Sequence, residues 1–179
     1  MTTLRQPYYE LSPAVYNALV QAKTALENST LDTTLMELVY LRVSQINGCA
    51  FCLEMHSKAL RKSGVPQHKL DALAGWRVSH HFDERERAAL AWAESVTEIA
   101  RTHAEDEVYQ PLLEHFSAAE ISDLTFAIGL MNSVEPFIGG VINLKFPYLV
   151  WLNIFSTTSS ISVSTERQPD AYHRAVSSF

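Results

Sequence analysis

The sequence contains few cysteines and few glycines. Two of its 179 residues are cysteine and six are glycine. Because 47% of the residues are hydrophobic and 19% are charged, the composition is that of a globular protein with a sizeable core, and it excludes a disordered chain. The length suits one compact domain better than two independent cores.

Positive charge is scarce as well. The chain has 14 lysines and arginines against 20 aspartates and glutamates, which gives a formal net charge of −6, and it has no long run of basic residues. Binding to nucleic acid requires a concentrated basic surface, because the protein must neutralise phosphates. We therefore expect no nucleic acid among the partners.

Targeting signals and uninterrupted apolar segments are also missing. The first residues, MTTLRQPYYELSP, have no apolar stretch after a basic start, so we expect no signal peptide. The apolar segment 137–155 contains a lysine, a proline, two glycines and two asparagines, whereas a membrane span needs about 20 nearly uninterrupted apolar residues. We expect a cytoplasmic protein without a membrane partner. In a reducing compartment, a Cys-x-x-Cys pair is more often catalytic or metal-binding than structural.

The hydrophobic pattern is helical as far as residue 132. Apolar residues recur every three or four positions, and Gly48 is placed to end one of the helices. No alternating apolar and polar run lies between turn signals before residue 133, so we expect an all-α fold. Signals for the start of a helix occur at Ser12, Asp32, Asp83 and Ser117.

The pattern of residue types changes after Asn132. Prolines and glycines interrupt the apolar pattern, and a polar, β-branched stretch follows at 157–165. We therefore expect a helical domain over residues 1–132 and a C-terminal extension of uncertain structure over residues 133–179. A reading-frame change that replaced the native end and an unrelated extension are two hypotheses for the second segment.

Both cysteines lie in one short segment, which reads NGCAFCLEMH over residues 47–56. On a helix that begins near Cys49, positions 49, 52 and 56 share one face, because steps of three and four return to the same side. The first turn of a helix favours an anion, and His56 one turn after Cys52 can accept a proton, so both features favour a thiolate. Cys49 is placed to close a disulfide with a sulfenic acid on Cys52, which releases water.

The residues alone leave three interpretations of this pair open: a redox pair, part of a zinc site, or two buried thiols. A structural zinc site needs four ligands, and beyond Cys49, Cys52 and His56 the sequence has no second cysteine pair and no paired-histidine motif at zinc-finger spacing. Free cysteines often pack as small core residues. The nearby His56 favours the redox pair, and we expect no bound metal or cofactor.

The spacing of Glu37, eleven residues, Cys49, two residues, Cys52, three residues and His56 resembles the core motif of the alkylhydroperoxidase D (AhpD-like) family of the carboxymuconolactone decarboxylase superfamily. The resemblance covers about residues 10–132. It implies an all-helical fold, an obligate homo-oligomer that is a trimer or a hexamer, and thiol-dependent peroxidase or disulfide reductase activity in antioxidant defence.

The resemblance also implies a role for each residue of the motif. Cys52 attacks a hydroperoxide, Cys49 donates a proton and then resolves the sulfenic acid to a disulfide, and Glu37 and His56 form a proton relay. The residues alone would make Glu37 a surface charge or the ion-pair partner of a basic residue such as Arg42. An external dithiol, which is a lipoyl group or a thiol protein, is the implied reductant.

One position departs from the family pattern. The best-characterised branch of the family has a histidine directly before the second cysteine, where this chain has Phe51. A relay here must run through Glu37, His56 and water, or be weaker. Two alternative functions stay open: a non-catalytic redox-sensing or structural helical oligomer, and a decarboxylase-type enzyme of the superfamily. The decarboxylase members lack the cysteine pair, which favours the peroxidase.

Overall fold

The computed structural model describes residues 6–139, and within this range it contains helices and no β-strand, so the prediction of an all-α fold is confirmed for these residues. The elements are α1 (Tyr8–Leu11), α2 (Pro13–Glu27), α3 (Thr33–Asn47), α4 (Ala50–Lys62), α5 (Gln67–Asp71), the 3₁₀ helix η1 (Leu73–Val78), α6 (Glu84–Thr97), α7 (Ile99–Thr102), α8 (Asp106–His115) and α9 (Ala118–Gly139). Among the described residues, no helix is both long enough and apolar enough to cross a membrane.

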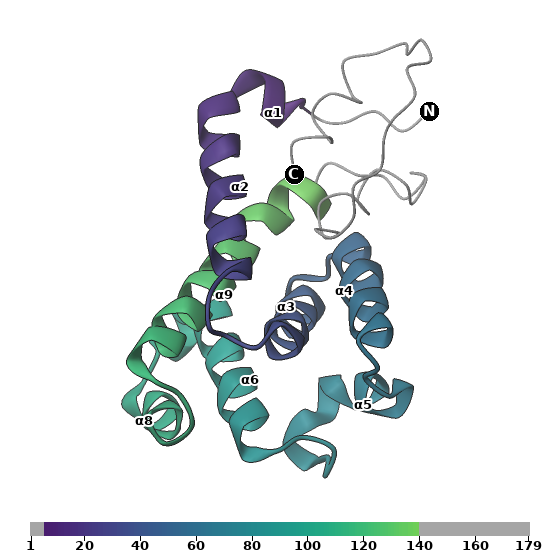
Figure 1. The fold of residues 1–179 in the computed structure, drawn as a ribbon, viewed down its shortest axis with the longest axis vertical. Helices are drawn as coiled ribbons and strands as arrows, with labels where there is room; N and C mark the ends of the chain where they lie inside the picture. The colour runs from purple at the N-terminus through teal and green to yellow at the C-terminus, as the bar shows by residue number, and fades with distance from the viewer. Residues whose placement is uncertain (1–5, 140–179) are drawn as a thin grey trace.

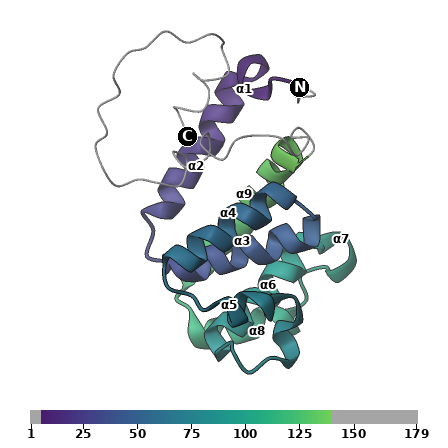
Figure 2. The ribbon, with the colours of Figure 1, turned by 90° about the vertical axis from the view of Figure 1, so that its right-hand side faces the viewer.

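Helix α3 lies at the centre of the fold. It packs against α4, α6 and α9, and the views in Figures 1 and 2 show α3 and α4 side by side. Helix α2 packs against α9, which crosses it diagonally, and α8 packs on the outer side of α6 (Figure 1). The side chains of α3 are therefore enclosed from several directions, which is why eight residues of this helix are buried.

Several helices begin and end at the residues that the sequence indicates. The side chain of Asp32 accepts a hydrogen bond from the backbone N–H of Leu35 at 2.8 Å, which caps the start of α3. Asp83 and Glu86 form a reciprocal capping box at the start of α6. Gly48 ends α3 with φ 69°, a left-handed conformation that glycine adopts without steric strain.

Helix α9 runs through the expected boundary at residue 132 and continues to Gly139, with Pro136 inside it. A proline removes one hydrogen bond from a helix, so this last part needs support from its surroundings. The support comes from Glu135, which hydrogen-bonds to two residues of α3. The division into two segments stays a prediction, since residues 140–179 lie outside the described residues.

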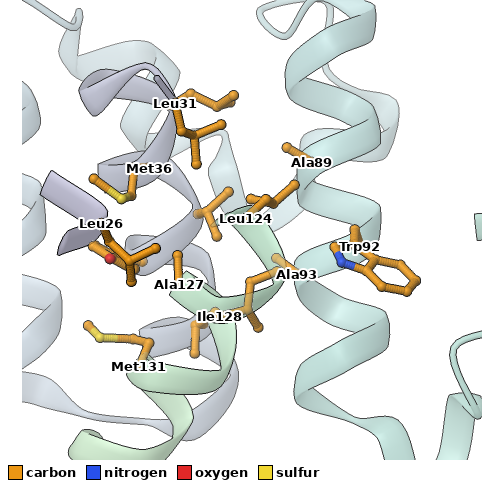
Figure 3. Close-up of a cluster of buried hydrophobic side chains, with 14 of the residues drawn as sticks. Leu26, Leu31, Met36, Ala89, Trp92, Ala93, Leu124, Ala127, Ile128 and Met131 are labelled. Atoms are coloured by element: carbon orange, nitrogen blue, oxygen red, sulfur yellow. The ribbon is translucent and has the colours of Figure 1, made fainter. Parts of the chain in front are cut away.

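The main hydrophobic cluster is formed where α9 packs between α3 and α6. Leu124 and Ile128 of α9 are fully buried, with Met36 on one side and Ala93 on the other (Figure 3). Small side chains on α6, such as Ala93, let α6 and α9 approach each other closely. The indole N–H of Trp92 donates to Thr125 of α9 at 2.9 Å, so a polar contact also joins the two helices.

Two adjacent leucines of α8 provide a test of this core. Leu112 is fully buried in the main cluster, whereas Leu113 is 53% exposed. We expect Leu112→Ala to lower the free energy of unfolding by about 2–5 kcal/mol, because it removes buried methyl groups and leaves a cavity. The matched Leu113→Ala variant should lose less than about 1 kcal/mol. Urea unfolding followed by circular dichroism measures both, and equal losses would contradict this placement of α8.

Candidate functional site

The four site residues that are predicted from the sequence lie on one helical hairpin. Glu37 is on α3, Cys49 is the N-cap of α4, and Cys52 and His56 follow in the first two turns of α4. The left-handed turn at Gly48 brings α4 back alongside α3. The hairpin therefore places all four residues in one part of the fold.

Cys49 and Cys52 form a disulfide, with their Cα atoms 5.3 Å apart. The backbone N–H of Cys52 donates to Cys49 Sγ at 3.4 Å, as expected at the start of a helix. Such an N–H group also stabilises a thiolate once the disulfide is opened. Cys49 is 4% exposed and Cys52 is 0% exposed, so the disulfide lies inside the protein, within the main hydrophobic cluster.

Glu37 and His56 form a pair next to the cysteines. Glu37 Oε2 lies 2.8 Å from Nδ1 of His56, and the imidazole is fully buried. The local sequence offered Arg42 as a partner for Glu37, but Arg42 donates to Glu94 at 2.7 Å instead. An ionised carboxylate at Nδ1 holds the ring proton there, which makes Nε2 the basic nitrogen of His56. The imidazole lies one helical turn after Cys52, on the same face of α4.

The aromatic ring of Tyr40 packs beside the Glu37–His56 pair. Its ring centroid is 5.2 Å from that of His56, and the side chain is buried. Burial raises the pKa of the Tyr40 hydroxyl well above its usual value, and the negative charges of Glu37 and Glu27 raise it further. Tyr40 therefore stays protonated at higher pH than an exposed tyrosine does, and its ring packs beside the imidazole.

Glu135 is a buried acidic residue at the site that sequence reasoning missed. It is 3% exposed, Asn47 Nδ2 donates to its Oε2 at 2.5 Å, and its Oε1 lies 2.6 Å from Ser44 Oγ. Burial raises the pKa of the Glu135 carboxyl, while the two hydrogen bonds and the nearby His56 act in the opposite direction. A glutamate inside an apolar helix was the available signal, but its position beyond residue 132 placed it in the expected extension.

The hydroxyl of Ser44 contacts two oxygen acceptors. Ser44 Oγ is 2.8 Å from the carbonyl oxygen of Tyr40 and 2.6 Å from Glu135 Oε1. Because a hydroxyl has one proton to donate, the two oxygens share it. Ser44 therefore joins Glu135 of α9 to the backbone of α3.

Glu135 also approaches both sulfur atoms. One of its carboxylate oxygens, Cys49 Sγ and Cys52 Sγ all lie within 4.8 Å of one another, and all three residues are buried. Within residues 6–139, these three side chains make up the one group of His, Cys, Asp or Glu residues whose ligand atoms are close enough together to share a metal ion. The structure thus adds a carboxyl group to the cysteine pair.

Comparison with protein families places the cysteine segment in a known context. The sequence model of the carboxymuconolactone decarboxylase family matches residues 13–95, which include Glu37, both cysteines and His56. The chain is 33% identical to the uncharacterized protein YdfG of Bacillus subtilis (strain 168) over 129 residues, which cover 72% of this chain and 88% of that protein. It is 35% identical to the uncharacterized protein YnjA of Escherichia coli (strain K12) over 106 residues, which cover 59% of this chain and 58% of that protein.

Two solved structures share the fold. The first is a protein of unknown function from Agrobacterium tumefaciens, for which a role as the antioxidant defence protein AhpD has been suggested. It is 37% identical with a TM-score of 0.73, and the match covers 77% of this chain and 94% of that chain. The second is an uncharacterized peroxidase-related protein from Silicibacter sp. TM1040, which is 26% identical with a TM-score of 0.62; the match covers 70% of this chain and 66% of that chain.

Proposed function

Because the chain belongs to the carboxymuconolactone decarboxylase family, as one of its AhpD-like members, we propose that it is a thiol-dependent peroxidase or disulfide reductase of antioxidant defence. The observation that carries the proposal is the Cys49–Cys52 disulfide with the Glu37–His56 pair on the same hairpin. The names given to the two structural relatives, an AhpD protein and a peroxidase-related protein, support it.

In the oxidative half of the proposed reaction, the Cys52 thiolate attacks an oxygen of the hydroperoxide. The O–O bond breaks, Cys52 becomes a sulfenic acid, and the alcohol leaves with one proton. The sulfur of Cys49 then attacks Cys52, the S–S bond forms, and the hydroxyl group leaves as water. Two thiols are oxidised to a disulfide while one hydroperoxide is reduced to an alcohol and water.

Proton transfer is the proposed task of Glu37 and His56. Nε2 of His56 accepts the thiol proton of Cys52, directly or through water, and the carboxylate of Glu37 stabilises the imidazolium that results. Phe51 is partly buried against the main hydrophobic cluster and cannot carry a proton. The relay in this chain therefore consists of Glu37, His56 and water.

The reductive half of the cycle requires an external dithiol. We propose that a lipoyl group or a thiol protein in the cytoplasm attacks the disulfide, forms a mixed disulfide and then releases the two thiols as its own disulfide forms. No bound cofactor is part of this proposal.

We further propose that the protein works as a homotrimer or homohexamer. Large apolar side chains are exposed on the chain, among them Phe126 at 69% and Val15 at 63%. Contacts between subunits would cover such side chains. Sedimentation analysis of the full chain would measure the assembly directly.

A single-turnover experiment tests the proposed chemistry. The protein is reduced, freed of reductant without air, and mixed with one equivalent of an organic hydroperoxide. We expect two thiols per chain to disappear for each hydroperoxide consumed, with alcohol as the product. Thiols that persist while the hydroperoxide remains would count against the peroxidase.

Cys49→Ser should stop the same reaction after its first step. Without the resolving thiol, the sulfenic acid on Cys52 has no neighbouring sulfur with which to form a disulfide. We expect one hydroperoxide to be consumed per chain and dimedone to label Cys52, as detected by mass spectrometry. Label on the wild-type protein at the same level would mean that Cys49 does not resolve the sulfenic acid.

A further inference from the structure

Glu135 has no task in the peroxidase reaction, although it approaches both sulfur atoms. We propose that the reduced protein binds one zinc ion through Cys49 Sγ, Cys52 Sγ and a carboxylate oxygen of Glu135. The sequence pattern points to only three potential zinc ligands, Cys49, Cys52 and His56, and the fold adds Glu135 beside the two sulfurs. The proposal goes beyond the peroxidase function and requires only that the cysteines are reduced.

The distances suit a zinc ion after the disulfide is opened. Zn–S bonds of about 2.3 Å and Zn–O bonds of about 2.0–2.2 Å place the ligand atoms of a tetrahedral site roughly 3.5–3.8 Å apart. The three ligand atoms already lie within 4.8 Å of one another. Once the S–S bond breaks, the two sulfur atoms separate, and small side-chain rotations can bring all three ligands to a common centre.

The groups around these ligands are arranged as in a metal site. Asn47 and Ser44 hold the two oxygens of Glu135, and each oxygen of a carboxylate keeps a further lone pair for a metal. The backbone N–H of Cys52 points at Cys49 Sγ, which favours the thiolate that zinc requires. The carboxylate and one of the sulfurs are thus oriented before a metal arrives.

Charge provides a second argument. Glu135 is 3% exposed, and Ser44 and Asn47 contact its two oxygens. Two thiolates and a carboxylate without a metal would repel one another in this buried position. A zinc ion compensates two of the three negative charges. The empty fourth position of the tetrahedron can take water or an incoming thiol.

Zinc keeps its oxidation state when it binds, and every electron and proton in the process is accounted for. A dithiol reductant first passes two electrons to the Cys49–Cys52 bond, which gives two thiols, while the reductant becomes a disulfide. Zinc then replaces the two thiol protons, together with the proton of Glu135 where that residue is protonated, and these protons go to solvent. Zinc bound in this way occupies the sulfur of Cys52, so it would block attack on a hydroperoxide.

Metal titration tests the proposal without any peroxide, so its outcome is separate from that of the peroxidase assay. The full chain is reduced with a phosphine, desalted without air and titrated with zinc against a chromophoric chelator. We expect one zinc ion per chain for the reduced protein and none for the disulfide form. A reduced protein without stoichiometric zinc, or a disulfide form that binds equally well, would overturn the proposal.

A matched pair of variants isolates the carboxylate. Glu135→Gln should weaken zinc binding at least about tenfold, because an amide oxygen carries no charge and is a poorer ligand. Glu54→Gln makes the same change on the exposed side of α4 and should leave the affinity unchanged. Equal zinc affinities for Glu135→Gln and the wild type would refute the role of Glu135.

X-ray absorption at the zinc edge gives a test that needs no variant, in case Glu135→Gln does not fold. We expect two sulfur neighbours at about 2.3 Å and oxygen or nitrogen neighbours at about 2.0 Å. Four sulfur neighbours would mean that zinc bridges two chains, and a shell without sulfur would mean that it binds elsewhere. Either result would exclude the proposed site.

Discussion

Cys52→Ser is expected to reduce the turnover of an organic hydroperoxide by at least about 1,000-fold. Near neutral pH a serine hydroxyl is almost entirely protonated, whereas a cysteine is partly ionised and is intrinsically a strong nucleophile. A helix start and a nearby imidazole favour a thiolate in general, and neither can compensate for the absence of the sulfur. The measurement is the loss of hydroperoxide in the presence of a dithiol reductant, corrected for the reaction of the reductant alone.

The control for Cys52→Ser separates loss of chemistry from loss of structure. Cys52 is fully buried in the main cluster, and serine is smaller and more polar, so the urea midpoint of the variant must be measured alongside its activity. Cys49→Ser also breaks the disulfide, yet it should still consume one equivalent of hydroperoxide. Equal turnover by Cys52→Ser and the wild type would end the peroxidase proposal.

Glu37→Gln is expected to slow the oxidation of Cys52 by about 100-fold, within the range for loss of a general acid–base partner. Glutamine has nearly the same shape, but it has no charge to stabilise the imidazolium of His56. Its amide can also rotate and donate to Nδ1, which would force the ring proton onto Nε2 and remove the basic nitrogen. Stopped-flow oxidation of the reduced protein by a hydroperoxide measures the rate constant.

The pH dependence distinguishes this role of Glu37 from a purely structural one. At alkaline pH, Cys52 loses its proton without help from His56, so the difference between Glu37→Gln and the wild type should shrink as pH rises. A structural defect would lower the rate by the same factor at every pH. Glu54→Gln, on the exposed side of α4, serves as the control with the same change in charge. A Glu37→Gln rate within twofold of the wild type would remove Glu37 from the relay.

The helices could be predicted wherever their end signals are local. Asp32 caps α3 and Asp83 caps α6 through hydrogen bonds to residues three positions later, and Gly48 ends α3 by its own backbone preference. The 3₁₀ helix η1 was not predicted, because its short turns follow α5 without a cap of their own. A proline at position 136 predicts an interruption of the helix, but α9 continues through it.

The site could be predicted only where its residues are close in the sequence or shared with a family. The cysteines and His56 follow from helical spacing, whereas the nomination of Glu37 depended on the family resemblance. Its contact with His56 spans 19 positions and crosses from one helix to another. Glu135 contacts Ser44 across 91 positions, and neither periodicity nor the matched family segment, 13–95, contains information on such a pairing.

This difference in sequence separation bears on the order in which the parts of the site assemble. The α3–α4 hairpin joins residues that are near neighbours along the chain, and contacts of this kind form early because they close short loops. During synthesis the cysteines can therefore meet while α9 has not yet been made. The carboxylate of Glu135 arrives only when the last helix docks on α3. A newly made chain can thus bring its two cysteines together before Glu135 reaches them.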